Sequence, residues 1–281
     1  MTHMPLGRGA VPSLSLNNGV PIPQVGFGVF MIDPSVTASV ISSALDAGYR
    51  HFDLASFYGN EASVGAALKG SDVPRDELFI TTKVWNSDQG YDSTLAAFDT
   101  SCAALGFDTV DLYLIHWPAP MLDKYVHTWR ALERLYHDGR ARAIGVSNFE
   151  PVHLLRILEE CSVVPAVNQI ELHPYLQQRE LRALHANHSI VTEGWSPLAR
   201  GGLLNDPVLV SMAQRHGVTV AQVILRWHVQ LGNVVFPKSA TRSRIRSNIE
   251  VFGFGLSAAE MDQVEALDRN GRTGPHPNEY H

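Results

Sequence analysis

Short runs of apolar, β-branched residues alternate with longer segments of helical periodicity along most of this chain. Each apolar run is shorter than a core helix, and its composition is typical of a strand that is buried on both faces. Eight such runs predict strands, at residues 25–29, 49–53, 78–84, 110–116, 141–146, 166–170, 189–195 and 233–237. The pattern therefore predicts parallel strands that are joined by helices.

The segments between these strands carry helix periodicity and helix-terminal residues. Gly48 and Gly139 follow two of them, and Pro151 opens another, as is common at helix ends. Ahead of the first strand, Asn18-Gly19 predicts a β-hairpin because both residues tolerate positive φ. The predicted helices cover 35–48, 60–69, 92–105, 123–138, the segment that begins at 151, 177–187, 207–230, 242–248 and 257–267.

Eight strand–helix units predict an α/β fold, a single (β/α)8 TIM barrel with an N-terminal β-hairpin, in one domain that spans 1–281. A doubly wound sheet is the alternative, and it would carry a G-x-G-x-x-G fingerprint after its first strand. Here Gly26-Phe27-Gly28 is followed by residues 29–31, Val-Phe-Met, so the third glycine is missing. The barrel is therefore favoured.

The composition narrows the class of protein further. Of the 281 residues, 45% are hydrophobic and 18% are charged, which is typical of a globular chain. The net charge of -6 argues against a general polyanion-binding surface, so no nucleic-acid partner is expected. The chain has only two cysteines, and its N-terminus lacks the apolar core of a secretory signal, so we expect a cytoplasmic protein. No apolar run approaches the length of about 20 residues that a membrane span needs, so no membrane segment is expected.

Polar side chains stand at the ends of three consecutive predicted strands. Asp53, Lys83 and His116 end these strands, and Tyr58 follows Asp53 by five residues. Each also has a purely structural interpretation. Asp53 would cap a helix, and Lys83 would be a surface lysine with a buried stem. His116 would be a core histidine, and Tyr58 would simply pack. In a TIM barrel, however, the carboxyl ends of the strands face one mouth. We therefore expect the four groups to converge there.

Their chemistry suits reduction of a carbonyl group. A buried lysine is costly unless a carboxylate pairs with it, and Asp53 can supply that charge to Lys83. The ammonium is expected to lower the pKa of Tyr58 from its usual value of about 10, which makes Tyr58 a usable general acid. A neutral His116 can donate a hydrogen bond to the carbonyl oxygen. Such a site lacks a source of hydride, so a nicotinamide cofactor is implied.

At these residues the sequence resembles the aldo-keto reductase superfamily, especially its bacterial broad-specificity and 2,5-diketo-gluconate reductase-like members. The resemblance is carried by residues 48–61, by Thr-Lys-Val-Trp at 82–85 and by Leu-Ile-His-Trp-Pro at 114–118. It implies that Asp53, Tyr58, Lys83 and His116 form the catalytic tetrad. It also implies a monomeric, NADPH-dependent oxidoreductase that reduces small carbonyls, 2-oxoaldehydes or keto sugar acids to alcohols.

The basic, hydroxyl-rich segment 236–248 enters a predicted helix, which suits a phosphate at a helix N-terminus. A solvated basic helix face is the alternative reading. The resemblance assigns Lys238, Ser239 and Arg244 to the adenosine 2′-phosphate and Asn248 to adenine, so NADPH is favoured over NADH. It further assigns Ser147, Asn148 and Gln169 to the nicotinamide carboxamide, Trp195 to stacking on the ring, Ser196 and Leu198 to the pyrophosphate, and the backbone at Gly28 to the cofactor.

The resemblance also indicates where the substrate binds. Phe30, Trp85 and Trp117 are candidates for an apolar wall beside His116, although Phe30 is equally suited to core packing. The loop after His116 and the polar C-terminal tail are both short, which predicts a fairly open pocket.

Two other classes of protein are alternatives to a carbonyl reductase. A metal-dependent barrel hydrolase would carry a His-x-His pair at a strand end, and the sequence has none, so no metal is expected. A cofactor-binding regulatory subunit without turnover is the other alternative. All four catalytic positions are filled, which argues against it.

Overall fold

The structure, a computed structural model, describes residues 11–280. Within them, eight parallel strands form one sheet in which strands consecutive in sequence are neighbours in space. A parallel bridge between Val25 and Val235, with hydrogen bonds from Gly26 N to Val235 O and from Val235 N to Gln24 O, joins the two edge strands. The strands are β3 (Phe27–Gly28), β4 (His51–Asp53), β5 (Phe79–Val84), β6 (Val110–Ile115), β7 (Ala141–Ser147), β8 (Val167–Glu171), β9 (Val191–Trp195) and β10 (Val234–Val235).

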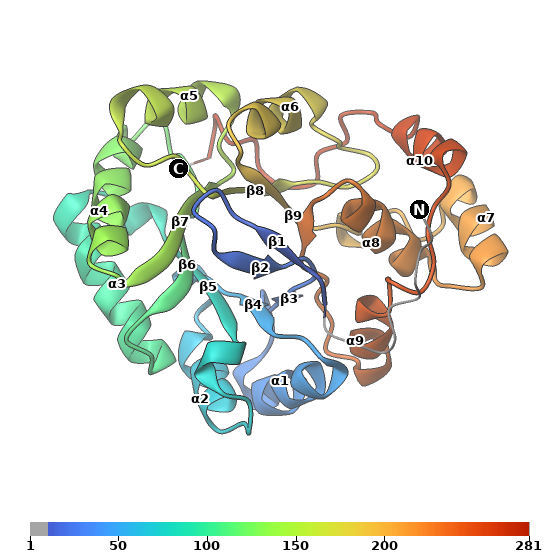
Figure 1. Ribbon diagram of the computed structural model, residues 1–281, viewed down its shortest axis with the longest axis horizontal. Coiled ribbons are helices and arrows are strands. Elements are labelled where there is room, and N and C mark those ends of the chain that lie inside the picture. Colours follow the sequence, from blue (N-terminus) through green and yellow to red (C-terminus); the bar gives the residue numbers. More distant parts are fainter. Residues whose placement is uncertain (1–10, 281) are drawn as a thin grey trace.

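Helices surround these strands (Figure 1), which confirms the predicted TIM barrel. Most begin and end within a few residues of the predicted positions, because the caps that end them are local. Asp33 and Pro34 begin α1, for example, and Gly48 in the left-handed conformation ends it. The helices are α1 (Pro34–Ala47), α2 (Glu61–Lys69), α3 (Tyr91–Leu105), α4 (Tyr125–His137), α5 (Pro151–Glu160), α6 (Arg179–Asn187), α7 (Pro207–His216), α8 (Val220–Gln230), α9 (Arg242–Ile249) and α10 (Ala258–Glu265).

The predicted hairpin is also present and lies across one opening of the barrel (Figure 1). Its strands, β1 (Ser13–Ser15) and β2 (Pro21–Pro23), are antiparallel. Leu16 and Ile22 pack against Phe79 and Val167, the first residues of β5 and β8. The hairpin therefore closes the amino-terminal end of the barrel and leaves the carboxyl ends of the strands free.

The inward face of the strands changes from apolar to polar along the barrel. Phe79 packs inside with the hairpin, whereas Ile80 packs outside among the helices. Since side chains alternate along a strand, Lys83 shares the inward face with Phe79. The same count from Val167 and Val191 turns Gln169 and Glu193 inward. The upper interior therefore gathers polar groups from several strands.

The single helical region predicted at 207–230 is wrong in one respect. It forms two helices, α7 and α8, with a bend of 90° between them. Gly217 adopts a φ of 65° and ends α7, and Thr219 begins α8 through a capping box with Gln222. No single helix in the described part of the chain is long and apolar enough to cross a membrane. Only the bent pair, taken together, reaches that length and composition.

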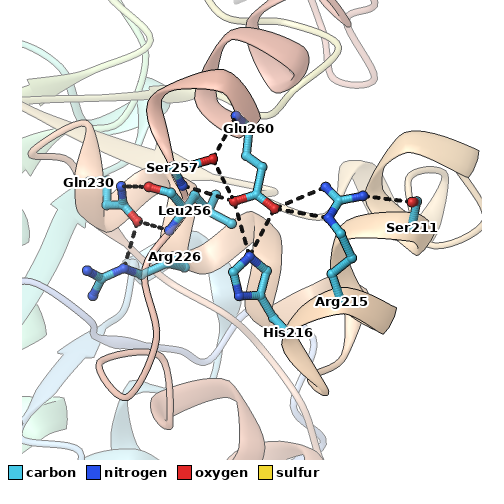
Figure 2. A network of polar contacts seen from close by, with 8 residues as sticks. All are labelled: Ser211, Arg215, His216, Arg226, Gln230, Leu256, Ser257 and Glu260. Atoms are coloured by element: carbon cyan, nitrogen blue, oxygen red, sulfur yellow. Dashed lines mark hydrogen bonds and ion pairs between the residues drawn. The ribbon is translucent and has the colours of Figure 1, made fainter.

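A polar network holds the C-terminal helix α10 against α7 (Figure 2). Glu260 accepts a hydrogen bond from Ser257, the N-cap residue of α10. It also accepts hydrogen bonds from Arg215 and His216 at the end of α7. Burial raises the pKa of Glu260, but these hydrogen bonds outweigh it and hold the pKa at about 2. The network fixes the point from which the C-terminal tail leaves toward the barrel mouth.

Candidate active site

Lys83 lies at the centre of the polar cluster that was predicted at the mouth. Its side chain is fully buried, and Nζ donates hydrogen bonds to Asp53 Oδ1 at 2.7 Å, to Leu54 O at 2.7 Å and to Tyr58 Oη at 3.5 Å. Burial lowers the pKa of Lys83, but the charges of Asp53 and Tyr58 raise it by more. The ammonium is therefore charged at neutral pH and has three acceptors for its three hydrogens.

Tyr58 reaches Lys83 because the chain turns sharply after β4. A 3-10 turn over Ser56–Tyr58 ends at Gly59, whose φ is 67°, and Ser56 Oγ donates to Lys83 O at 3.0 Å. Burial raises the pKa of Tyr58, and the charge of Lys83 offsets this only in part. The expected net lowering of this pKa is therefore wrong, because the burial of the ring cannot be read from a local sequence pattern. Tyr58 holds its proton at neutral pH.

His116 follows β6 and faces Tyr58 from the other side. The two rings are 5.8 Å apart in an edge-on arrangement, and the ring of Trp85 lies 5.0 Å from that of His116. Burial, followed by the charge of Lys83, lowers the pKa of His116 well below its usual value. The imidazole is therefore neutral and can donate one hydrogen bond without bringing a charge.

An amide network joins this cluster to the strands that follow. Asn148 adopts a left-handed conformation with a φ of 63°, and its amide nitrogen donates to His116 O at 2.9 Å and to Ser147 Oγ at 3.0 Å. Its oxygen accepts from Trp195 Nε1 at 2.7 Å. Ser147 Oγ donates to Gln169 O at 2.8 Å. The predicted carboxamide-binding residues and Trp195 thus form one connected patch beside His116.

Gln169 links this patch to Asp53 and to a residue that sequence reasoning missed. Its Nε2 donates to Asp53 Oδ1 and to Glu193 Oε2, both at 2.9 Å. Glu193 is fully buried, and burial and the charge of Asp53 raise its pKa to about 8. A signal was present, because Glu193 is the one charged residue within a strand that is otherwise apolar or small.

The predicted phosphate-binding residues lie along the next part of the barrel rim. Ser196 follows β9 with a φ of 50°, and Ala199 and Arg200 also have positive φ. Non-glycine residues with positive φ are costly and cluster where a ligand or site requires them. Leu198 is half-buried in the same loop.

The basic segment after β10 leads directly into α9. Lys238 and Arg244 are exposed, whereas Ser239 and Asn248 are buried. The side chain of Thr241, the N-cap residue of α9, makes no capping hydrogen bond. A Cβ at Gly28 would lie 3.5 Å from Phe236 O and 3.7 Å from Lys238 Cβ, so Gly28 adjoins this segment. Exposed cations beside an uncapped helix N-terminus fit a phosphate group.

Aromatic rings surround the mouth on the side of Tyr58 and His116. Phe30, which is 47% exposed, has its ring 4.9 Å from that of Tyr58, so it lies at the mouth rather than in the core. Trp85 stacks on Phe57 at 3.8 Å, and Trp117 lies beside His116 in sequence and is nearly buried. Phe57 was not predicted, although its position next to Tyr58 in the loop was a signal.

The C-terminal tail crosses the mouth and narrows it. Glu171, at the end of β8, accepts hydrogen bonds from Thr273 N at 2.7 Å and Gly274 N at 2.9 Å. A Cβ at Gly274 would lie 2.4 Å from Cη2 of Trp195, so the tail rests on that ring. Tyr280 then packs on Trp117, with ring centroids 4.5 Å apart. The tail therefore lies over this side of the mouth, and the fairly open pocket stays a prediction.

A metal centre gains no support from the positions of the side chains. Among residues 11–280, no group of three or more His, Cys, Asp or Glu side chains is placed to hold a metal ion.

Comparison with known proteins identifies the family. The model of the Aldo/keto reductase family matches residues 25–269. The chain belongs to the aldo/keto reductase family. An aldo-keto reductase of Mycolicibacterium smegmatis is 53% identical over 96% of this chain and 98% of that protein. The glyoxal reductase of Bacillus subtilis is 50% identical over 95% of this chain and 96% of that protein. This aldo/keto reductase also matches the crystal structure of the Gox0644 D53A mutant in complex with NADPH, with a TM-score of 0.94 and 47% identity over 97% of this chain and 100% of that chain.

Proposed function

We propose that this aldo/keto reductase reduces aldehydes and ketones to alcohols with NADPH, and that Tyr58 is the proton donor. The observation that carries the proposal is the position of Lys83, whose Nζ contacts both Asp53 and Tyr58 in a fully buried site. The ring of His116 lies on the other side of Tyr58. Such a cluster has the parts that protonation of a carbonyl oxygen requires.

Each residue has a distinct part in the reaction. The substrate oxygen accepts hydrogen bonds from the Tyr58 hydroxyl and from neutral His116, which polarises the carbonyl group. When it is bound, NADPH would supply the hydride for the carbonyl carbon. As negative charge grows on the oxygen, Tyr58 gives it a proton, and the charge of Lys83 stabilises the phenolate that remains. Asp53 keeps Lys83 charged in a site from which water is excluded.

The fit of the cofactor is argued from the donor set at the rim. Ser147, Asn148 and Gln169 would bind the carboxamide, and Trp195 would stack on the nicotinamide ring. Ser196, Leu198 and the backbone of Gly28 would line the path of the pyrophosphate. Lys238, Ser239 and Arg244 would bind the 2′-phosphate, and Asn248 would contact adenine. The NADPH complex of Gox0644 supports this choice of cofactor.

For the substrate, we favour small carbonyls and 2-oxoaldehydes over keto sugar acids. The wall offers aromatic rings from Phe30, Trp85 and Trp117, to which Phe57 and Tyr280 add. Among residues 11–280, the side chains that form this wall include no basic group that would recognise a substrate carboxylate. The related protein of Bacillus subtilis is a glyoxal reductase, which agrees with this preference. A single domain over 1–281, a monomer and a cytoplasmic location stay predictions.

The test is a panel of carbonyl compounds with NADPH and NADH, on wild type and Tyr58→Phe. Loss of the general acid should lower kcat by at least about 100-fold, while NADPH still binds. Tyr113→Phe is the matched control, because the Tyr113 hydroxyl is buried in β6 and has no partner in the described part of the chain. If Tyr58→Phe turns over like wild type, the mechanism is wrong. If wild type oxidises NADPH with none of the carbonyls, the proposed activity is wrong.

A further inference from the structure

Glu193 is a buried carboxyl group that the proposed mechanism does not use. The sheet register pairs Glu193 directly with Gln169, and Gln169 with Ser147. Its side chain is fully buried, and Oε2 accepts a hydrogen bond from Gln169 Nε2 at 2.9 Å. The other oxygen, Oε1, is buried and has no hydrogen-bond partner in the described part of the chain. A polar atom in this state is costly and calls for a functional reason.

The two carboxyl groups fix the orientation of the amide between them. Gln169 Nε2 donates one hydrogen bond to Asp53 and one to Glu193. The opposite orientation would point the amide oxygen at the Asp53 carboxylate, which repels it, and would take the N–H donor away from Glu193 Oε2. The oxygen of Gln169 is therefore left free to accept a hydrogen bond from a ligand. If the carboxyl group of Glu193 is removed, Gln169 Nε2 keeps its hydrogen bond to Asp53 only. One of the two hydrogen bonds that orient the amide is then lost.

Glu193 is also an acidic group that has no cation of its own as an ion-pair partner in the described part of the chain. Lys83 pairs with Asp53 and makes no direct contact with Glu193. Glu193 is therefore neutral when it is protonated, and its charge is compensated only in part, by Lys83, when it is not. Either state is costly in the interior of the barrel, and costs of this kind cluster at functional sites.

We propose that Glu193 is a positioning residue for the nicotinamide, and that its ionisation shifts the binding preference of the site from NADPH toward NADP⁺. The inference rests on the proposed use of this cofactor. Glu193 holds the Gln169 amide with its oxygen toward the carboxamide. The reduced ring is uncharged and the oxidised ring carries a positive charge, so an ionised Glu193 attracts the oxidised ring.

The other charged and titratable groups do not obscure the effect of Glu193 ionisation on cofactor binding. Burial and Asp53 raise the pKa of Glu193 to about 8. The pKa values of Lys83 and Tyr58 are raised from values that already lie at 10 or above, and Asp53 is paired with Lys83. Three buried histidines of the barrel, His51, His116 and His228, have pKa values far below 6.5 and are neutral throughout.

The experiment measures Kd for NADPH and for NADP⁺ by calorimetry between about pH 7 and about pH 9.5, in wild type, Glu193→Gln and Glu193→Met. In wild type, the ratio of the two Kd values should move toward NADP⁺ by about tenfold as Glu193 ionises. The ratio should be independent of pH in both variants. Glu193→Met should also weaken NADPH by about 3- to 10-fold at pH 7, and Glu193→Gln should restore that loss because its amide oxygen still accepts from Gln169.

Glu61 supplies the matched control for these substitutions. It is a buried glutamate with a raised pKa, and it is bonded to Thr82 and Ser101 outside the barrel interior. Glu61→Gln should leave the pH dependence of the Kd ratio as in wild type. If Glu61→Gln removes that dependence as Glu193→Gln does, the effect is not specific to Glu193 and the inference is overturned.

A readout without cofactor tests the ionisation itself. A carboxyl group whose pKa is raised in the folded state binds more protons folded than unfolded, so stability falls as pH rises from the unfolded value through about 8. Wild type should therefore lose stability relative to Glu193→Gln over this range. A ratio of Kd values that is flat in wild type, or equally pH-dependent in Glu193→Gln, overturns the inference. Failure of wild type to bind either cofactor would instead overturn the proposed function.

Discussion

Replacement of Asp53 by Asn tests whether the charge of Lys83 is held by its partner. Lys83 Nζ lies 2.7 Å from Asp53 Oδ1, and the lysine side chain is fully buried. Without the carboxylate, its remaining partners are the carbonyl oxygen of Leu54 and the hydroxyl of Tyr58, both uncharged. Breaking a buried ion pair on one side costs about 3–5 kcal/mol. We expect the lower end, about 3 kcal/mol, because an Asn oxygen still accepts and Glu193 lies nearby.

The loss should depend on pH in a direction that the structure fixes. In wild type the pKa of Lys83 is raised, so its contribution to stability is lost only as pH rises through that value. Without Asp53, burial dominates and the folded pKa of Lys83 falls below its unfolded value of about 10.4. The folded variant then binds fewer protons than the unfolded chain, and its stability rises with pH. The gap between Asp53→Asn and wild type should therefore narrow between about pH 7 and about pH 10.

Urea unfolding, followed by circular dichroism, measures this in wild type, Asp53→Asn, Lys83→Met and the double variant. The double variant should be more stable than the sum of the single losses predicts, by about 2 kcal/mol or more. Asp111→Asn is the control: Asp111 is buried, but its partners Arg75 and Arg142 are 29% and 48% exposed and can be hydrated. The stability that Asp111→Asn loses relative to wild type should not become smaller as pH rises. Additive losses in the double variant, or a gap for Asp53→Asn that is constant with pH, would refute the reasoning.

Three further predictions concern the cofactor rim and the tail. Arg244→Ala should raise the Kd of NADPH by about tenfold or more and leave that of NADH nearly unchanged, and equal effects on both would remove the 2′-phosphate assignment. Gly274→Ala places a Cβ 2.4 Å from Cη2 of Trp195, so it should shift the indole and weaken NADPH binding, whereas Gly253→Ala, with nothing within 4 Å, should not. Tryptophan fluorescence titrations measure both. Since the pKa of Glu260 is held at about 2, its contribution to stability is present above the usual value of 4.5 and is lost as pH falls toward 2. Thermal unfolding should therefore find Glu260→Gln less stable than wild type at neutral pH and equal to it at about pH 2, and a pH-independent difference would contradict the prediction.

The sequence by itself determined the barrel and most of what faces its mouth. Strand signals, helix ends and the hairpin turn depend on residues that are close together in the chain, so the pattern was sufficient to predict them. The positions of Asp53, Lys83 and His116 at the ends of strands were also sufficient to place them at one mouth of the barrel. The resemblance to a family then added the roles of these residues.

Only the tertiary structure decided the electrostatics and the shape of the mouth. The net direction of the Tyr58 pKa depends on how deeply the ring is buried, which no local pattern measures. Burial, and then the charge of Asp53, raise the pKa of Glu193, and Asp53 lies far away in the sequence. Tyr280 packs on Trp117, and Gly274 packs on Trp195. Both contacts depend on the path that an irregular tail follows across the barrel. These are long-range contacts, and they exist only once the chain has closed on itself.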